Sequence, residues 1–164
     1  MKLSQGVEWA VHCCLLLIQA QPGTAVPRTT LAGYYGLPDA YLAKHLKSLS
    51  AAGVLLATSG PRGGFRLARD PKEISVLDVV EAVEGAAPAF VCTEIRQRGA
   101  CALPAERCTT PCGIAQVMGD ADQAWRQSLK SVTIADLGDR LAPELQQRAR
   151  AWLQDPTAPL PPFA

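Results

Sequence analysis

Apolar residues recur along the first part of the chain with the spacing of helices. In residues 4–19 they stand three and four apart, which predicts an amphipathic helix that Pro22-Gly23 ends. Shorter stretches of the same kind predict a helix over residues 28–35 and another over 39–52, with Gly36-Leu37-Pro38 breaking the chain between them. The first fifty residues are therefore predicted to form three helices.

The pattern then changes to that of a β-hairpin. Residues 54–58 and 65–68 predict two strands, and the six residues between them include three glycines and a proline. A hairpin that follows three helices is the element order of a winged helix–turn–helix domain. The predicted fold class is mainly α with a small β wing.

The rest of the chain is predicted to be helical except for one irregular stretch. Ser75 can cap a helix that reaches about residue 83, and Thr133 with Asp136 resembles a capping box at the start of a short helix. Residues 85–112 are rich in glycine, proline and cysteine. We divide the chain into four segments. They are a winged helix–turn–helix domain (residues 1–84), a cysteine-rich loop (85–112), a long helix with further C-terminal helices (113–154), and a Pro-rich tail that is predicted to be disordered (155–164).

The charge is distributed unevenly along the chain. Residues 1–74 hold eight Lys or Arg against four Asp or Glu, whereas residues 75–164 hold eight against eleven. A basic first half favours nucleic acid as a partner. The apolar run at residues 11–18 is shorter than the roughly 18 residues of a membrane span, and the N-terminus does not resemble a secretory signal. We therefore expect a cytoplasmic protein with no membrane partner.

The second helix of the predicted helix–turn–helix carries candidate DNA contacts. In this motif the N-terminal, polar side of that helix enters the major groove, and the glycine-rich tip of a wing allows its arginines to reach the backbone or minor groove. The candidates for base and phosphate contacts are Tyr41, Lys44, His45, Lys47 and Ser48 on the helix and Arg62 and Arg66 on the wing. The expected partner is double-stranded operator DNA.

Four of the six cysteines, Cys92, Cys101, Cys108 and Cys112, fall within 21 residues. Cys108 and Cys112 are close enough to hold one metal centre. Four thiolates could bind zinc, but intervals of eight, six and three residues lack the Cys-x₂-Cys knuckle of zinc sites. A disulfide switch is the third possibility. Neither a Cys-x-x-Cys motif, a nucleotide-phosphate loop nor a Ser–His–acid arrangement occurs, so we do not expect an enzyme.

Glu8 and His12 share one face of the first predicted helix because they stand four residues apart. They could be a solvated surface pair, or a carboxylate and an imidazole that replace thiolates on iron. The neighbouring Cys13 and Cys14 are predicted to be packed in the core, since buried unpaired cysteine is common.

Several segments together resemble the Rrf2 family of winged-helix regulators, which includes IscR, NsrR and CymR. They cover residues 1–138 and are Met1–Ser4, Tyr41–Leu46, Gly60–Leu67, Ile74–Gly85 and Ser131–Leu137. The resemblance implies a homodimer that pairs through the long helix at residues 113–131. It also implies, for many members, an iron–sulfur cluster in the loop before that helix.

The cysteine pattern departs from the commonest one of the family, in which five residues separate each of three cysteines. Residues 90–99, together with Glu8 and His12, instead resemble the RsrR-type redox sensors of the family. That resemblance implies a [2Fe–2S] cluster, with Cys108 and Cys112 from one subunit and Glu8 and His12 from the other, while Cys92 is not a ligand. A [4Fe–4S] cluster or zinc are alternative groups. The alternative function is a winged-helix regulator without a cluster that uses zinc or a thiol–disulfide switch.

Overall fold

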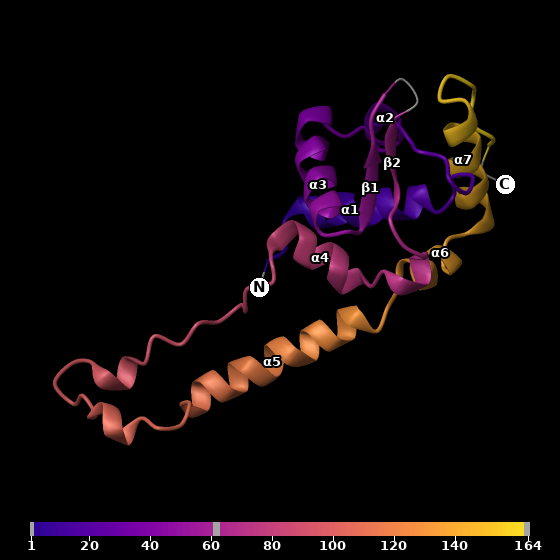
Figure 1. Cartoon of the computed structure of the whole chain (residues 1–164). Coiled ribbons are helices and arrows are strands. Elements are labelled where there is room, and N and C mark those ends of the chain that lie inside the picture. Colours follow the sequence, from indigo (N-terminus) through magenta and orange to yellow (C-terminus); the bar gives the residue numbers. More distant parts are fainter. Residues whose placement is uncertain (1, 61–62, 163–164) are drawn as a thin grey trace.

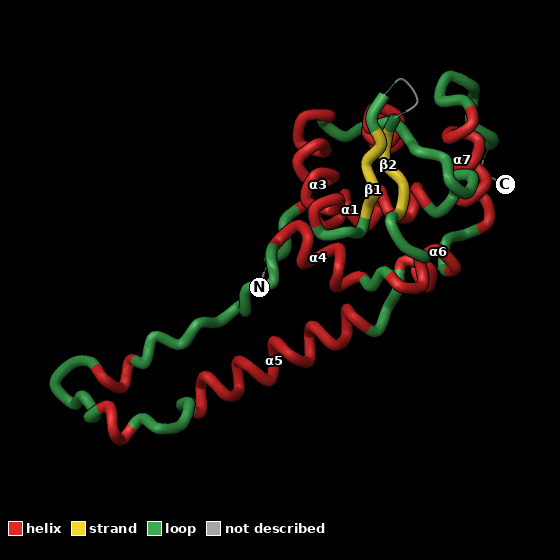
Figure 2. Tube along the Cα trace, in the orientation of Figure 1, coloured by secondary structure: helices red, strands yellow, loops and turns green. Residues whose placement is uncertain are grey.

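The computed structural model describes residues 2–60 and 63–162 and consists of a body and a projecting arm (Figure 1). The body contains α1 (Gln5–Leu17), α2 (Arg28–Tyr35), α3 (Asp39–Ala51), β1 (Leu55–Thr58), β2 (Gly64–Leu67), a 3₁₀ turn (Pro71–Glu73), α4 (Val76–Glu84), α6 (Ile134–Asp139) and α7 (Pro143–Gln154). The arm contains two 3₁₀ turns (Ile95–Gln97 and Ala105–Arg107) and α5 (Gly113–Lys130). Helices with one two-stranded sheet confirm the predicted fold class (Figure 2).

Helix α1 lies at the centre of the body. It contacts α3, α4, α6 and β2, and it is buried on more sides than the single apolar stripe that its spacing predicts. Cys13 and Cys14 are fully buried in it, which confirms that they are packed. Burial raises the pKa of Cys13 to about 12 and that of Cys14 further, so both thiols stay neutral and act as small apolar residues.

Two capping boxes fix how the arm joins the body. Ser75 caps α4 with Asp78, and Thr133 caps α6 with Asp136, as the sequence predicts for both starts. The two caps lie side by side, because Val76 N donates to Val132 O and Ile134 N donates to Ile74 O, both at 2.8 Å. The chain therefore leaves the body at the end of α4, and α5 brings it back beside the start of α4 (Figure 1).

The wing is attached to the segment before α2. β1 and β2 pair antiparallel, with Leu55 opposite Leu67 and Thr58 opposite Gly64. Val26 and Phe65 exchange two backbone hydrogen bonds of 2.8 Å. Val26 therefore pairs with β2 along the edge that β1 leaves open. A Cβ atom at Gly64 would overlap the backbone carbonyl of Val26, which explains why glycine stands there.

In the described part of the chain, the arm meets the body at one of its ends (Figure 1). Arg126 of α5 binds Glu81 of α4 and Asp122, and it donates to the carbonyls of Ala86 and Ala87 at 3.1 and 3.2 Å. Towards its N-terminus α5 exposes an apolar stripe of Ile114, Val117 and Met118. None of the helices in the described part of the chain is long and apolar enough to cross a membrane.

The C-terminal helix packs onto the helix–turn–helix. Trp152 Nε1 donates to the carbonyl of Thr30 at 3.0 Å, and the indole lies against Gly33 and edge-on to Tyr34. The Pro-rich segment, which composition predicts to be disordered, is described up to residue 162, and Pro161 O accepts a hydrogen bond from Arg148 of α7. The amino-acid composition of the segment does not predict this contact with α7.

Candidate DNA interface and metal centre

Helices α2 and α3 form a helix–turn–helix that is fixed at both ends of its turn. Gly36 ends α2 in the left-handed conformation with φ of 64°, and Leu37 N donates to Ala32 O at 2.9 Å. Arg28 and Asp39 form two hydrogen bonds of 2.7 Å between the first residues of the two helices. With this bracing the outward side of α3 is held in one orientation.

The outward side of α3 brings together most of the candidate DNA contacts. Leu42, Leu46 and Leu49 are fully buried and define the inner face. The residues that lie away from this face, as helical spacing requires, are Tyr41 (67% exposed), Lys44 and Lys47, with Ser48 half-buried beside them. Two cations and a hydroxyphenyl group on one exposed helix face suit a phosphate backbone and base edges.

His45 has a different environment from its neighbours on α3. Its ring is half-buried against the backbone of Gly6, and it meets the indole of Trp9 edge-on with ring centres 6.0 Å apart. A side chain at position 6 would overlap this ring. His45 therefore ties α3 to α1, a contact that the spacing of residues on α3 alone does not reveal.

The wing candidates are only partly described. Arg66 lies on β2 opposite Leu56 and is half-buried. Arg62, the candidate at the tip, lies outside the described residues. The wing stands beside α2 on the same end of the body (Figure 1).

Glu8 and His12 are both exposed, one turn apart on α1. The backbone carbonyl of His12 accepts a hydrogen bond of 3.0 Å from the Tyr35 hydroxyl, and the two rings lie 5.3 Å apart. These contacts fix the turn of α1 that carries His12 and leave the Glu8 carboxylate at the surface. The pair can therefore reach a ligand outside its own chain.

Cys112 is the N-cap of α5 and accepts a hydrogen bond from Ala115 N at 3.4 Å. This bond is the main cause that lowers the pKa of Cys112, and a hydrogen bond from Cys92 and the charge of Arg96 add to it. A thiol at a helix N-terminus is stabilised as thiolate, the form that binds metals. Cys108 is half-buried nearby, and Cys101 is exposed.

Arg96 organises the cysteine loop. It forms a two-point ion pair with Glu94 and also donates to Thr110 O at 3.0 Å, which joins the two sides of the loop. Its charge interacts with Cys108 and Cys112. The sequence interpretation missed the role of Arg96 and the nearness of Cys92 to Cys112. The Glu-x-Arg pair that Glu94 and Arg96 form among the cysteines was a signal that could have identified Arg96.

One chain does not bring the two candidate ligand pairs together. The cysteine loop lies at the far end of the arm, whereas α1 lies in the body (Figure 1). Within the described residues no group of three or more His, Cys, Asp or Glu side chains is placed to hold one metal ion. A centre that uses both pairs would therefore need two chains.

Comparison with known proteins gives a consistent result. The profile of the Rrf2 family, described as iron-dependent transcriptional regulators, matches residues 3–140. YffB of Lactococcus lactis, by name an HTH-type transcriptional regulator, is 30% identical over 141 residues, which are 85% of this chain and 88% of that protein. Rv1287 of Mycobacterium tuberculosis, named in the same way, is 31% identical over 148 residues, or 88% and 85% of the two chains.

Two solved structures show the same fold. CymR of B. subtilis, named as a global cysteine regulator, has a TM-score of 0.66 and 20% identity over 87% of this chain and 99% of its own. IscR of T. potens has a TM-score of 0.59 and 23% identity over 87% and 93% of the two chains.

Proposed function

The chain belongs to the Rrf2 family of transcriptional regulators, and from this membership we propose that it is a homodimeric regulator that senses redox state through a [2Fe–2S] cluster. The observation that carries the proposal is the placement of the two ligand pairs. Each pair is suited to iron, and the two lie too far apart in one chain to share a centre. A second copy of the chain would supply the missing half of each site.

The exposed stripe on α5 supports the dimer. Ile114 and Val117 are 67% and 66% exposed, although both stand on the apolar side of an 18-residue helix. Contiguous exposed apolar side chains of this kind mark association surfaces. Pairing of two α5 helices would cover the stripe and would carry the cysteine loop of one chain towards the body of the other.

The donor set fits a cluster of mixed ligation. Cys108 and Cys112 supply two thiolates whose charge Arg96 offsets, and Glu8 and His12 of the other chain supply a carboxylate and an imidazole. A [2Fe–2S] cluster held there supplies one-electron redox chemistry. Within the chain, α1 carries Glu8 and His12 on successive turns. Trp9, the residue after Glu8, contacts His45 of α3. A change in the position of α1 would therefore reach the DNA-binding helix through one side-chain contact.

Replacement of single cysteines tests the ligand set. We expect Cys108→Ala and Cys112→Ala to abolish the visible absorbance of anaerobically purified protein, since each removes a ligand, together with its iron and sulfide content. Cys101→Ala is the matched control, because Cys101 is exposed in the same loop, and it should keep both. A fully coloured Cys112→Ala protein would refute the site.

Lys44→Ala tests the DNA surface. We expect weaker binding to operator DNA with unchanged visible absorbance, because Lys44 is exposed on α3 and lies away from the cysteines. Loss of one phosphate contact should reduce the slope of log K against log salt by about one. Fluorescence anisotropy at several salt concentrations measures both quantities, and Lys130→Ala at the end of α5 is the control. An unchanged slope for Lys44→Ala would place the DNA surface elsewhere.

A thiol switch without a cluster is the second candidate, and the nearness of Cys92, which helps to lower the pKa of the Cys112 thiol, favours it. A hydroperoxide could oxidise this pair: the two thiols lose two protons and two electrons as the S–S bond forms, and the peroxide becomes an alcohol and water. Cys92→Ala separates the two candidates. It should retain the colour and the redox response under the cluster proposal, but abolish the response under the thiol switch.

A further inference from the structure

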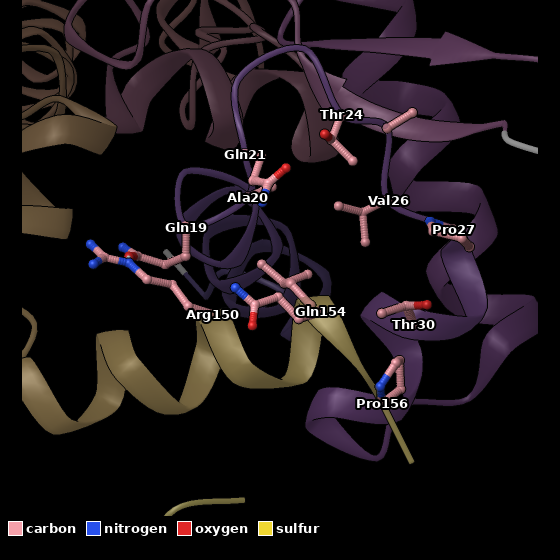
Figure 3. A pocket seen from close by; sticks show the side chains of 12 residues that line it. Gln19, Ala20, Gln21, Thr24, Val26, Pro27, Thr30, Arg150, Gln154 and Pro156 are labelled. Carbon is pink, nitrogen blue, oxygen red and sulfur yellow. The ribbon is translucent and has the colours of Figure 1, made fainter. Parts of the chain in front are cut away.

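A cavity of about 680 Å³ lies between α7 and the segment that connects α1 to α2 (Figure 3). Its volume is in the range of sites that bind small molecules. The walls come from three parts of the chain: the segment after α1 (Gln19–Gln21), the segment before α2 with one residue of that helix (Thr24–Pro27 and Thr30), and the end of α7 with the residues after it (Arg150, Leu153, Gln154 and Pro156). The proposed cluster and the outward face of α3 contribute no residue to it.

Arg150 gives the cavity a positive charge. Its Nε donates to Gln19 Oε1 at 3.1 Å and its Nη2 donates to Gln146 Oε1 at 3.4 Å, so both acceptors are uncharged amides. No carboxylate lines the cavity, and Arg150 takes part in none of the ion pairs found among the described residues. Figure 3 shows the Arg150 guanidinium beside Gln19, at the end of the cavity away from Val26. A guanidinium at one end of a cavity whose lining has no carboxylate suits an anionic ligand with planar oxygens.

The remaining walls define the rest of the ligand. Val26, Leu153 and Pro156 contribute apolar atoms to the lining. Gln154 and Thr24 contribute hydrogen-bonding groups (Figure 3). A single positive charge beside an apolar wall matches a molecule with one carboxylate and an apolar body. A fully polar polyanion would leave the apolar wall without a partner.

The cavity also touches the segment that positions the DNA-binding elements. Val26 in its wall exchanges two backbone hydrogen bonds with Phe65 of the wing. Thr30, on the same side of the cavity, belongs to α2 and accepts the hydrogen bond from Trp152 of α7. A ligand beside these residues would contact the residue to which the wing is bonded, the first helix of the helix–turn–helix and α7 together.

We propose that this cavity binds a small monocarboxylic acid with an apolar body, and that its occupancy adjusts the wing relative to α2 and so changes the affinity for DNA. The carboxylate binds Arg150, and the apolar body lies against Val26 and Leu153. The site is independent of the cysteine loop, so the chain has a second input that acts on the same DNA-binding domain.

Binding can be tested on the full chain without DNA, by ¹⁵N-resolved NMR with hexanoate, 4-methylpentanoate and 3-phenylpropanoate as probes. We expect at least one probe to shift the Trp152 indole signal saturably while the Trp9 signal stays in place. The corresponding primary amides, and the Arg150→Gln variant, should bind about tenfold more weakly or worse, because a charge-assisted contact is lost. Arg140→Gln, which makes the same change outside the cavity, should bind like the unmodified chain.

The outcomes separate the two halves of the proposal. If no probe shifts the Trp152 signal, or if Arg150→Gln binds as well as the unmodified chain, the site is refuted. If binding occurs but DNA affinity, measured by anisotropy with and without the probe, stays the same, the regulatory half is refuted. Because the NMR measurement involves neither DNA nor the cluster, failure of the proposed redox function would leave its result unaffected.

Discussion

Two colourless variants are expected to regain colour when their subunits are mixed. One chain carries Glu8→Ala and His12→Ala, and the other carries Cys108→Ala and Cys112→Ala. In the proposed arrangement the cysteine loop of each chain meets α1 of its partner, so each homodimer would lack half of the ligands at both sites. One site of the heterodimer would have all four ligands and the other would have none. Reconstitution after subunit exchange should therefore give up to one cluster per heterodimer, measured by absorbance, iron and sulfide.

This experiment distinguishes the three arrangements that the residues permit. If all ligands came from one chain, mixing would restore nothing. If Glu8 and His12 were only a solvated pair, their double variant would be coloured before mixing, which would end the proposal of mixed ligation. The matched control is a chain with Glu106→Ala and Cys101→Ala, an exposed carboxylate and thiol of the same loop, which should be coloured alone.

Gly64→Ala is expected to impair the wing. The added Cβ would overlap the backbone carbonyl of Val26, and a backbone group cannot rotate aside as a side chain can. The two Val26–Phe65 hydrogen bonds should be lost or strained, which would lower the free energy of unfolding by about 1–3 kcal/mol. DNA affinity should fall by about tenfold or more, because a displaced wing no longer reaches the backbone beside the groove occupied by α3.

Gly119→Ala is the control for this substitution. Gly119 stands in the middle of α5 with nothing within 4 Å of an added Cβ, so alanine there should raise the stability by about 0.5–1 kcal/mol and leave DNA binding unchanged. Urea denaturation and anisotropy titrations measure the two effects. Wild-type DNA affinity in Gly64→Ala would show that attachment of the wing to Val26 is not needed for binding.

Helix α1 is the element through which the proposed cluster would act on DNA binding. Its exposed side carries Glu8 and His12, while its buried side fills the centre of the body. Between these sides, Gly6 and Trp9 receive the ring of His45. The glycine is what permits this close approach, so the position of α3 depends on that of α1.

The sequence alone determined the elements whose causes are local. The helical spacing of leucines placed α3 within one residue of its observed end, and Gly36 marked the turn before it. Ser75 and Thr133 predicted the starts of α4 and α6, because a capping box is formed by two residues that stand three positions apart in the sequence. Family resemblance added the expectation of a dimer and a cluster.

Only the tertiary structure decided which distant residues meet. His45 stands at the border of the inner face of α3, a position at which helical periodicity fits a buried and an exposed side chain equally. Because Gly6 has no side chain, the ring of His45 can pack against α1. The hydrogen bond from Arg96 to Thr110 joins the two sides of the cysteine loop, and Cys92 helps to lower the pKa of Cys112 across it. The Val26–Phe65 pairing and the cavity beside Arg150 likewise join segments far apart in the chain. Such contacts depend on how complete elements pack, whereas spacing along the chain records only neighbours within a turn or two.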